Sequence, residues 1–312
     1  MNGLQLSREY FVSVAEPKLK LDFPALHPHL AAGLAGNGSE CFGYDDEISR
    51  DHDWGADFYI WVEDEDSGSI PALQSWKDEL MKSSPPSSAR ERSEYGARVA
   101  VMTCSSFYSG LIGASGRPET LNEWLRAPEE NFAMAVNGEV FADGPGTFTR
   151  TRNALLSYYP EDIRLKRIAA KLMALAQTGQ YNLLRTSLRD DRVTLRTIVS
   201  RFTDAAIALV FLLNKVYRPY YKWAYRALGG LPLLGAETAR TLREIADVGG
   251  FDQGAISELT CLAERLCATF AAELGKQYLS GSDDSFLAAH AEEVRKRIKS
   301  GSLRDLPVQY DI

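Results

Sequence analysis

Two aspartates, Asp51 and Asp53, are the residues whose type and spacing best suit chemistry. They begin a stretch, residues 51–63, in which mostly apolar side chains occupy even positions and acidic side chains occupy four odd ones. This alternation is typical of a strand, which would place the two carboxylates on one face, about 6–7 Å apart. Such a pair suits Mg²⁺, which takes one or two carboxylates together with water and phosphate oxygens.

A Gly-Ser pair, Gly38 and Ser39, precedes this stretch, with eleven residues between Ser39 and Asp51. It follows residues 30–36, a short apolar segment typical of a strand that enters a turn. Glycine lets backbone N–H groups approach a phosphate, and the serine hydroxyl can donate to it. A helix cap at Ser39 needs the same geometry, so the two roles are compatible. The eleven residues suffice to return the chain beside the strand.

Arg50 stands directly before the aspartates. It could contact a phosphate, or it could pair with an acidic residue of the 45–47 loop; both interpretations stay open. The acids of that loop are expected to be solvated and to position the turn rather than to bind metal.

The spacing Gly-Ser, eleven residues, Asp-x-Asp resembles the signature of the polymerase-beta-type nucleotidyltransferase superfamily, which includes aminoglycoside and minimal nucleotidyltransferases. Longer blocks resemble an uncharacterised bacterial family of that superfamily described as nucleotidyltransferase-like. These blocks include Gly-Ser-Glu, Gly-Tyr-Asp-Asp-Glu and Ser-Arg-Asp-His-Asp-Trp-Gly within residues 38–55, and the stretches 140–143, 158–162 and 217–223. The resemblance covers most of residues 5–230.

The resemblance implies a mixed sheet with helices, with the turn at Gly38 and Ser39 on a nucleoside triphosphate. It also implies that Asp51 and Asp53 hold Mg²⁺, with two ions expected. A third carboxylate on a neighbouring strand is common in the superfamily. The candidates are Asp143 and Glu139, whose spacing of four predicts one face of a strand. Asp143 is preferred, because it ends the strand at the position that the family pattern holds.

Two basic residues farther along the chain are candidates for contact with the nucleotide phosphates. Lys222 lies between Tyr221 and Trp223 in a block that resembles the family, and Arg185 is a second candidate. For Lys222 the alternative is an ordinary amphipathic lysine at the surface.

The predicted reaction moves a nucleoside monophosphate from an NTP, with ATP expected, to a hydroxyl-type acceptor and releases pyrophosphate. The acceptor is a small molecule or a protein. Because the motif places no cysteine or histidine on the face of the aspartates, the transfer is expected to be direct. Two alternatives remain: a non-catalytic relative that binds a nucleotide or a partner, and an AMP transferase that acts on a partner protein.

The composition fits a globular protein of 312 residues, with 45% hydrophobic and 25% charged side chains. The longest apolar run, residues 205–213, is far shorter than the roughly 20 residues of a membrane span. No secretory signal pattern is seen at the N-terminus. The prediction is therefore a cytoplasmic protein without a membrane partner. No basic stripe with interleaved aromatic residues is present, so a nucleic-acid partner is not expected.

The predicted fold class is α+β, with a mixed-sheet domain at residues 1–146 and a helical bundle at 147–312. Helical periodicity dominates the second part. Residues 1–145 carry 24 acidic and 11 basic side chains, a net charge of −13, whereas residues 146–312 carry 18 and 24, a net charge of +6. This asymmetry suggests a site for cations and an anion between the two halves; the alternative is that the halves simply attract each other.

Overall fold

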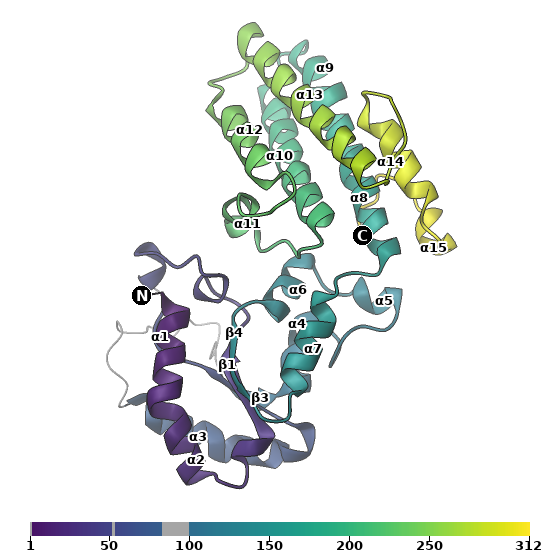
Figure 1. Ribbon diagram of the computed structural model, residues 1–312. Coiled ribbons are helices and arrows are strands. Elements are labelled where there is room, and N and C mark those ends of the chain that lie inside the picture. The colour runs from purple at the N-terminus through teal and green to yellow at the C-terminus, as the bar shows by residue number, and fades with distance from the viewer. Residues whose placement is uncertain (1, 52–53, 83–99) are drawn as a thin grey trace. The chain divides into compact units, whose positions relative to one another are not determined.

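The computed structural model describes residues 2–51, 54–82 and 100–312, and of Arg50 and Asp51 it describes the backbone only. The chain forms two compact units, residues 1–158 and 159–312. The α+β fold class is confirmed, with a four-stranded mixed sheet in the first unit and helices in the second (Figure 1).

The boundary between the units lies twelve residues later than the predicted one, after Tyr158 rather than after residue 146. The difference is helix α7 (Thr147–Leu156), which packs on the sheet. Its Phe148 stacks on Trp61 with a distance of 3.8 Å between ring centroids, and its backbone carbonyl accepts a hydrogen bond from Tyr108. An aromatic side chain buried in the first core therefore assigns this helix to the first unit.

The sheet has the strand order β3-β2-β1-β4. Strands β1 (Leu30–Leu34) and β4 (Glu139–Asp143) match the expected strands closely, and β2 (Tyr59–Val62) and β3 (Val101–Thr103) complete the sheet. β1 pairs antiparallel with both β2 and β4, and β2 pairs parallel with β3. Since β1 is paired on both sides and buried along its whole length, its ends are fixed in space.

Helices cover both faces of the sheet. On one face lie α1 (Gly3–Tyr10), the π-helical segment Phe11–Ala15, α2 (Glu16–Asp22) and α3 (Ile70–Lys82), whose apolar side chains form one core with Leu30, Ala32 and Ile60. The other face carries α4 (Cys104–Ile112) and α7, with Phe107 and Phe148 against Tyr59 and Trp61. Figure 1 shows α1 and α7 on opposite sides of the strands. Two short helices, α5 (Leu121–Trp124) and α6 (Glu129–Val136), precede β4.

Among the described residues, the predicted strand at residues 51–63 is wrong at 51 and at 54–58. Residues Ile48–Asp51 form a 3₁₀ helix, and the strand begins only at Tyr59. Asp57, one of the acidic odd positions of this stretch, is buried, and its Oδ1 atom lies 2.8 Å from the Nζ atom of Lys77 on α3, which is also buried. A lysine twenty residues away in sequence thus neutralises the carboxylate and lets the segment turn inward.

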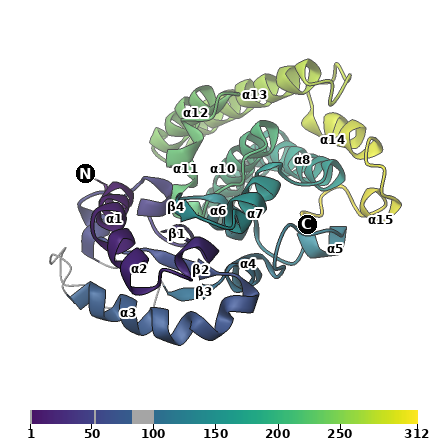
Figure 2. The same cartoon turned by 60° about the horizontal axis from the view of Figure 1, so that its bottom comes forward.

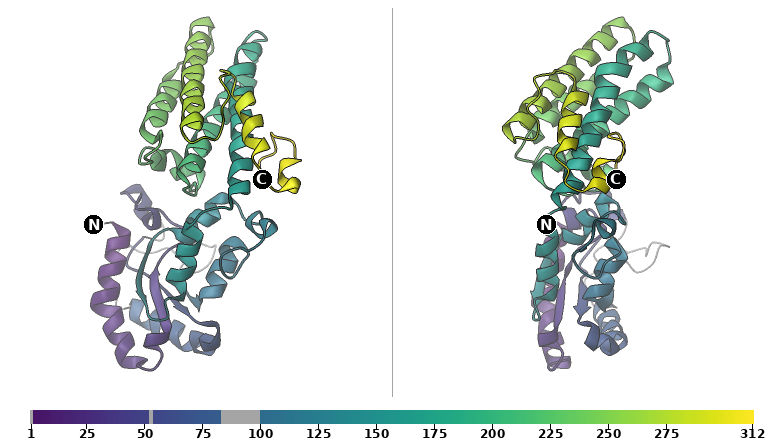
Figure 3. Two further views of the ribbon diagram at one scale, coloured as in Figure 1. Left: turned by 45° about the vertical axis from the view of Figure 1, so that its right-hand side comes forward. Right: turned by 90° about the vertical axis from the view of Figure 1, so that its right-hand side faces the viewer.

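The second unit is a bundle of antiparallel helices, as predicted (Figures 2 and 3). Helix α8 packs against α10 and α14, and α10 also packs on α9, α11 and α12. The elements are α8 (Glu161–Leu175), the π-helical segment Ala176–Asn182, α9 (Leu183–Ser187), α10 (Arg192–Asn214), α11 (Tyr221–Leu228), α12 (Gly235–Asp247), α13 (Gln253–Lys276), α14 (Leu287–Lys296) and α15 (Gly301–Arg304).

Helix α10 is long and apolar enough, by length and composition, to cross a membrane, although its longest uncharged run is short. In this structure 61% of the most apolar stretch of α10 is buried inside the protein. Its side chains pack against α8 and the π-helical segment, so the apolar character of α10 is used in the core of the bundle.

We predict that Lys77→Met destabilises the first unit by about 3 kcal/mol or more, because it removes the ammonium group that lies 2.8 Å from the buried Asp57 carboxylate. The measurement is the free energy of unfolding in urea, followed by circular dichroism. The double variant Asp57→Asn/Lys77→Met should recover part of the loss, since the neutral amide can still accept from the Phe58 N–H group. An unfolding free energy of Lys77→Met equal to that of the parent would contradict the structural role of this pair.

Candidate functional site

The turn with Gly38 and Ser39 directly follows the central strand, as predicted. Gly36 and Gly38 have φ angles of +96° and +137°, a backbone conformation that side chains other than glycine rarely adopt. Ser39 then begins a short 3₁₀ helix, Glu40–Phe42. Among the described residues, the Ser39 hydroxyl caps no backbone amide of that helix. The capping role is therefore not realised, and Ser39 is half-buried.

The side chain of Asn137 holds this turn against the start of β4. Its Oδ1 atom accepts a hydrogen bond from the Gly36 N–H group at 2.7 Å, and its Nδ2 atom donates to the Gly36 carbonyl at 2.8 Å. The next residue, Gly138, donates its N–H to the carbonyl of Cys41 at 2.8 Å. These three bonds tie the backbone before and after Ser39 to the residues that lead into β4. Asn137 was not among the predicted site residues, although the Asn-Gly pair at 137–138 is a recognised turn signal.

Gly138 is required at its position by space as well as by conformation. Its φ angle is +67°, and a Cβ atom there would lie 1.9 Å from the carbonyl oxygen of Leu34. The guanidinium of Arg152, on α7, donates to the carbonyls of Val136 and Gly138 at 2.9 and 3.0 Å. The chain before β4 is thus held from both sides.

The register of the sheet decides which carboxylate lies near the turn. Gly33 pairs with Tyr59, and Leu34 pairs with Glu139. The end of β1, the start of β2 and the start of β4 therefore meet at one edge of the sheet, which also carries the Gly38 turn. Asp143 pairs with Ala31 and lies toward the opposite edge, about 10 Å from Leu34 along β1 at roughly 3.3 Å per residue.

An irregularity in β4 also separates the two candidates by face. The register shifts between Ala32 and Gly33, where β4 carries one extra residue. Glu139 and Asp143 therefore pair with residues three apart on β1, which point to opposite faces. The expectation that their spacing of four places them on one face is wrong, because a β-bulge cannot be seen in the residue spacing.

The contacts of the two carboxylates agree with this separation. Glu139 faces α1, where its Oε1 atom lies 3.3 Å from the guanidinium of Arg8. Asp143 faces α7, and its two carboxylate oxygens accept from the N–H groups of Gly146 and Thr149, each at 2.8 Å. Asp143 thus caps the start of α7. The geometry gives no support to the preference for Asp143 as the third carboxylate and favours Glu139.

The side chain of Asp51 and the whole of Asp53 lie outside the described residues, as does the side chain of Arg50. The backbone of Asp51 ends the 3₁₀ helix that starts at Ile48. Their roles as metal and phosphate ligands stay predictions.

The loop that carries the aspartates is anchored on both sides of them. The Oδ2 atom of Asp45 accepts from the Gly3 N–H group at 2.7 Å and from the Trp54 indole at 2.9 Å. Asp46 accepts from the N–H and hydroxyl groups of Ser49. Asp45 and Asp46 therefore hold the segment that leads to Asp51, and Asp45 is half-buried rather than solvated as expected.

Lys222 and Arg185 lie at opposite ends of the second unit. Arg185 is on α9, directly before α10, and Lys222 is on α11, directly after it. Since α10 has 23 residues, it separates them by roughly 34 Å. The two cannot contact one triphosphate, so the prediction that both bind the nucleotide is wrong for at least one of them.

Their positions in the helical unit distinguish the two basic residues. Tyr217, five residues before Lys222, makes an edge contact with Tyr159, the first residue of this unit, at 4.9 Å between centroids. Lys222 is therefore at the end of the unit where the chain enters, and Arg185 is at the far end. Each is exposed and lies over a neighbouring ring, at 5.0 Å from Trp223 for Lys222 and at 4.8 Å from Tyr181 for Arg185.

The four cysteines are all free, and three are buried. Burial, followed by the nearby carboxylates of Glu63 and Asp143, raises the pKa of Cys104 to about 12. Burial also raises the pKa of Cys267 well above its ordinary value. These two thiols are poor nucleophiles, because the thiolate is the reactive form.

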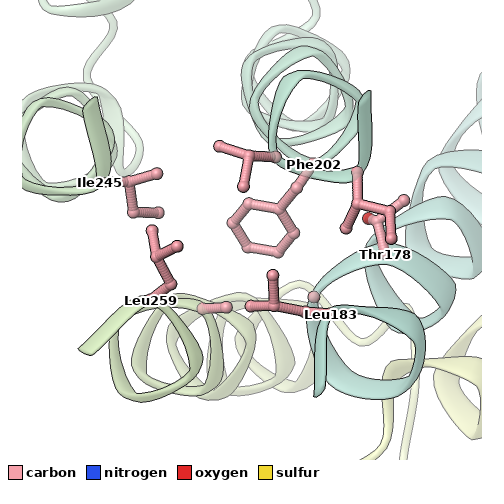
Figure 4. A pocket seen from close by; sticks show the side chains of 9 residues that line it. Thr178, Leu183, Phe202, Ile245 and Leu259 are labelled. Carbon is pink, nitrogen blue, oxygen red and sulfur yellow. The ribbon is translucent and has the colours of Figure 1, made fainter. Parts of the chain in front are cut away.

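An apolar cavity in the second unit is too small to be a ligand site. It is lined by side chains from α10, α12, α13 and the π-helical segment, and Figure 4 shows the ring of Phe202 between Leu183, Ile245 and Leu259. Its volume is about 10 Å³, which is no more than one water molecule needs. A Cβ atom at Gly179 would lie 2.4 Å from this ring, so the glycine makes room for Phe202.

No group of three or more histidine, cysteine, aspartate or glutamate side chains that could hold a metal ion occurs among residues 2–51, 54–82 and 100–312. The carboxylates considered for a metal ion are Asp51 and Asp53, which the sequence predicts, and Glu139, which the sheet register brings to the edge that carries the turn. As a donor set of carboxylates alone, they fit Mg²⁺ rather than Zn²⁺ or a softer ion.

A protein-family model described as a domain of unknown function, DUF4037, matches residues 124–224. That family is associated with nucleotidyltransferase-like proteins in general. The matched residues run from the end of α5 to α11 and include Asn137, Glu139 and Lys222, whereas the Gly38 turn and the aspartate pair precede them. No curated protein and no solved structure matches the chain.

We predict that one cysteine of four, the exposed Cys261, reacts with iodoacetamide in the native protein at about pH 8, near the ordinary pKa of a thiol. Cys104 and Cys267 are protected by burial and a raised pKa, and Cys41 by burial. Mass spectrometry of tryptic peptides gives the modified positions, and the unfolded chain should react at all four. Rapid native alkylation of Cys104 would contradict the core packing of α4.

Proposed function

We propose that this chain is a Mg²⁺-dependent nucleotidyltransferase. It transfers a nucleoside monophosphate from an NTP, for which ATP is the expected donor, to a hydroxyl-type acceptor. The observation that carries the proposal is the Gly38–Ser39 turn, which directly follows the paired central strand and is held in place by Asn137 and Gly138. The spacing from this turn to Asp51 and Asp53, and the coarse family match, support the same reaction.

The backbone and the hydroxyl of the turn bind the triphosphate. Asn137 and Gly138 fix its conformation, so the N–H groups do not need to be ordered when the nucleotide arrives. Preorganised donors of this kind lower the cost of binding an anion. Lys222 and Arg185 are separated by roughly 34 Å along α10, so the two cannot bind one triphosphate together.

Asp51 and Asp53 would hold Mg²⁺, with Glu139 as the third carboxylate in place of Asp143. When bound, the metal ions supply positive charge to the α-phosphate and the leaving group. The assignment of Glu139 follows from the edge of the sheet that it shares with the turn. Asp143 already accepts two backbone N–H bonds, which assigns it to the start of α7.

The reaction is a direct displacement. The acceptor oxygen forms a bond to the α-phosphorus as the bond between that phosphorus and the bridging oxygen breaks, and pyrophosphate leaves. The acceptor proton passes to a carboxylate at the sheet edge, for which Glu139 is the candidate. The thiol next to the turn, Cys41, is 3% exposed, and its Sγ atom lies 3.9 Å from the Asn37 carbonyl, so it is badly placed to attack a substrate.

We predict that Asp51→Asn and Asp53→Asn each abolish the Mg²⁺-dependent stabilisation by NTP. In the parent it should reach about 2.7 kcal/mol at an NTP concentration of about 100 times Kd. Thermal unfolding with each of the four NTPs, with and without Mg²⁺, measures this effect, and Asp78→Asn, an exposed acid on α3, is the matched control. Pyrophosphate release is then followed with a cell-extract filtrate or whole extract as the source of acceptors.

Three results of this experiment separate the alternatives. If NTP stabilises the protein but neither the filtrate nor the whole extract supports pyrophosphate release, the chain is better described as a non-catalytic relative. If NTP labelled at its α-phosphate transfers the label only to protein, the chain is an AMP transferase that acts on a partner protein. Either aspartate variant binding Mg²⁺ and NTP as tightly as the parent refutes the metal assignment.

We predict that Glu139→Gln slows turnover by at least about a hundredfold, the scale of a lost acid–base group or metal ligand, and leaves the fold intact. Loss of its exposed ion pair with Arg8 costs little stability. Asp143→Asn should do the opposite. It should lower the free energy of unfolding by about 1 kcal/mol, because one hydrogen bond that caps α7 is lost, and it should leave turnover nearly unchanged. The reverse pattern in the two variants would return the third carboxylate to Asp143.

A further inference from the structure

The segment that joins α13 to α14, residues 277–286, is held to α14 by side chains that the proposed reaction does not use (Figure 1). The ring of His290, on α14, is 2% exposed and contacts this segment with both nitrogens. Its Nε2 atom lies 2.8 Å from the carbonyl oxygen of Asp284, and its Nδ1 atom lies 2.9 Å from the hydroxyl oxygen of the buried Ser280. A histidine joined to a segment through both nitrogens couples that segment to its own protonation.

Glu293, three residues after His290 on α14, extends this network through the Ser280 hydroxyl. Its Oε2 atom lies 2.9 Å from the Ser280 hydroxyl oxygen and accepts a hydrogen bond from the Gly281 N–H group at 2.7 Å. The Ser282 N–H group donates to the Ser280 hydroxyl at 3.2 Å. Ser280 therefore connects the imidazole to the carboxylate.

The number of protons in this network determines the charge that it carries. The Asp284 carbonyl can only accept, so the Nε2 atom of His290 carries a proton. The Ser280 hydroxyl has a single proton, for which the Glu293 carboxylate and a bare Nδ1 atom would compete. All of these contacts are hydrogen bonds only when the network holds one further proton, so that Ser280 donates to one neighbour and accepts from the other.

The further proton belongs on His290 rather than on Glu293. A protonated Glu293 that donates to Ser280 would complete the same set of bonds with a neutral ring. Hydrogen bonds from the Gly281 N–H group and from the Ser280 hydroxyl lower the pKa of Glu293, because they stabilise its ionised form. Glu293 is therefore a carboxylate, and both nitrogens of His290 donate.

The elements packed against α14 bring charges that are engaged elsewhere. These elements are α8, α13 and the π-helical segment Ala176–Asn182, which has no acidic or basic side chain. The charged side chains of α8 contact groups outside the network: Glu161 contacts Arg164, Asp162 the N–H groups of Lys299 and Ser300, Lys166 the carbonyls of Pro307 and Val308, Arg167 the hydroxyl of Tyr159, and Lys171 the carboxylate of Asp311.

The charges nearest in sequence to the network are likewise engaged. They are listed with their contacts: on α13, Glu264 with Gln180, Arg265 with Glu244 and Glu273 with Lys276; in the joining segment, Asp284 with the Phe286 N–H group; and on α14, Glu292 with Arg295. Glu293 is thus the carboxylate that hydrogen bonds connect to His290.

We propose that this network is a pH-sensitive latch, which closes residues 280–284 onto α14 while His290 is doubly protonated and releases them when its Nδ1 proton passes to solvent. The neutral ring and the Glu293 carboxylate then compete for one Ser280 proton, so one contact becomes a repulsion between lone pairs. The latch stabilises the closed segment at low pH, and this contribution is lost as the pH rises. Gln180 holds the end of the segment separately, through the Ser285 carbonyl and the Leu287 N–H group. The inference is independent of the proposed nucleotidyltransferase reaction.

The test compares the full chain at about pH 5.5 and about pH 8.5, on either side of the range in which histidine side chains ordinarily change charge. Nitrogen-15 NMR of the protein labelled at histidine counts the protons on each ring, and His290→Gln identifies the His290 signals. At the lower pH we expect two protons on this ring. Hydrogen exchange of the peptide that covers residues 279–286, corrected for the intrinsic effect of pH, should show at least about fivefold less protection at the higher pH, the factor for one lost hydrogen bond.

Three variants distinguish a latch from a contact that is merely structural. His290→Gln should show the lower protection at both pH values. Glu293→Gln, at a half-buried side chain, should let His290 lose its proton at a lower pH than in the parent, and it keeps the test decisive if His290→Gln does not fold. His29→Gln, at an exposed histidine of the first unit, should retain the pH dependence of the parent.

Three outcomes would overturn the inference. The first is a His290 ring with a single proton at about pH 5.5. The second is equal protection of residues 279–286 at both pH values in the parent. The third is a pH dependence of this protection that persists in His290→Gln, which would assign the change to other groups.

Discussion

The pair of hydrogen bonds between the Asn137 amide and the backbone of Gly36 is the interaction on which the arrangement of the candidate site depends. It joins the end of β1 to the residues before β4, two segments a hundred residues apart. Strand β1 is fixed by pairing on both sides, so the turn that follows inherits a fixed position. Glycines at 36, 38 and 138 are the residues that allow the backbone to make these bonds.

Two constraints of the sheet follow from this arrangement and change the assignment of the site. Antiparallel pairing brings the start of β4 to the turn and sends its end away, and the bulge turns the two acids of β4 to opposite faces. Glu139 is thereby left beside α1 and Asp143 is used to start α7. Asp143 occupies the position of the carboxylate in the family pattern, but its observed contacts stabilise the start of α7.

Local patterns in the sequence were sufficient for much of the first unit. The apolar run that ends in glycines predicted β1 and its turn, and the short segment before Asp143 predicted β4. The helices of the second unit followed from their periodicity, because each buries one stripe of side chains. These features depend on residues that are near one another in the chain.

The features that could not be predicted depend on distant partners. Asp57 turns inward because Lys77 is there to neutralise it, Phe148 fixes α7 to the first unit because Trp61 lies beneath it, and the bulge in β4 has no signal in residue spacing. The separation of Arg185 from Lys222 required the length and direction of α10.

The measurement that tests the central claim most directly is isothermal titration calorimetry of the full chain with an ATP analogue that has a non-hydrolysable bond between the α- and β-phosphates. The account predicts one binding site whose affinity requires Mg²⁺. It also predicts at least about tenfold weaker binding for Asn137→Ala, because the turn would then be ordered at the expense of binding energy. Binding of equal strength in EDTA, or failure to bind any nucleoside triphosphate analogue with Mg²⁺ present, would contradict it.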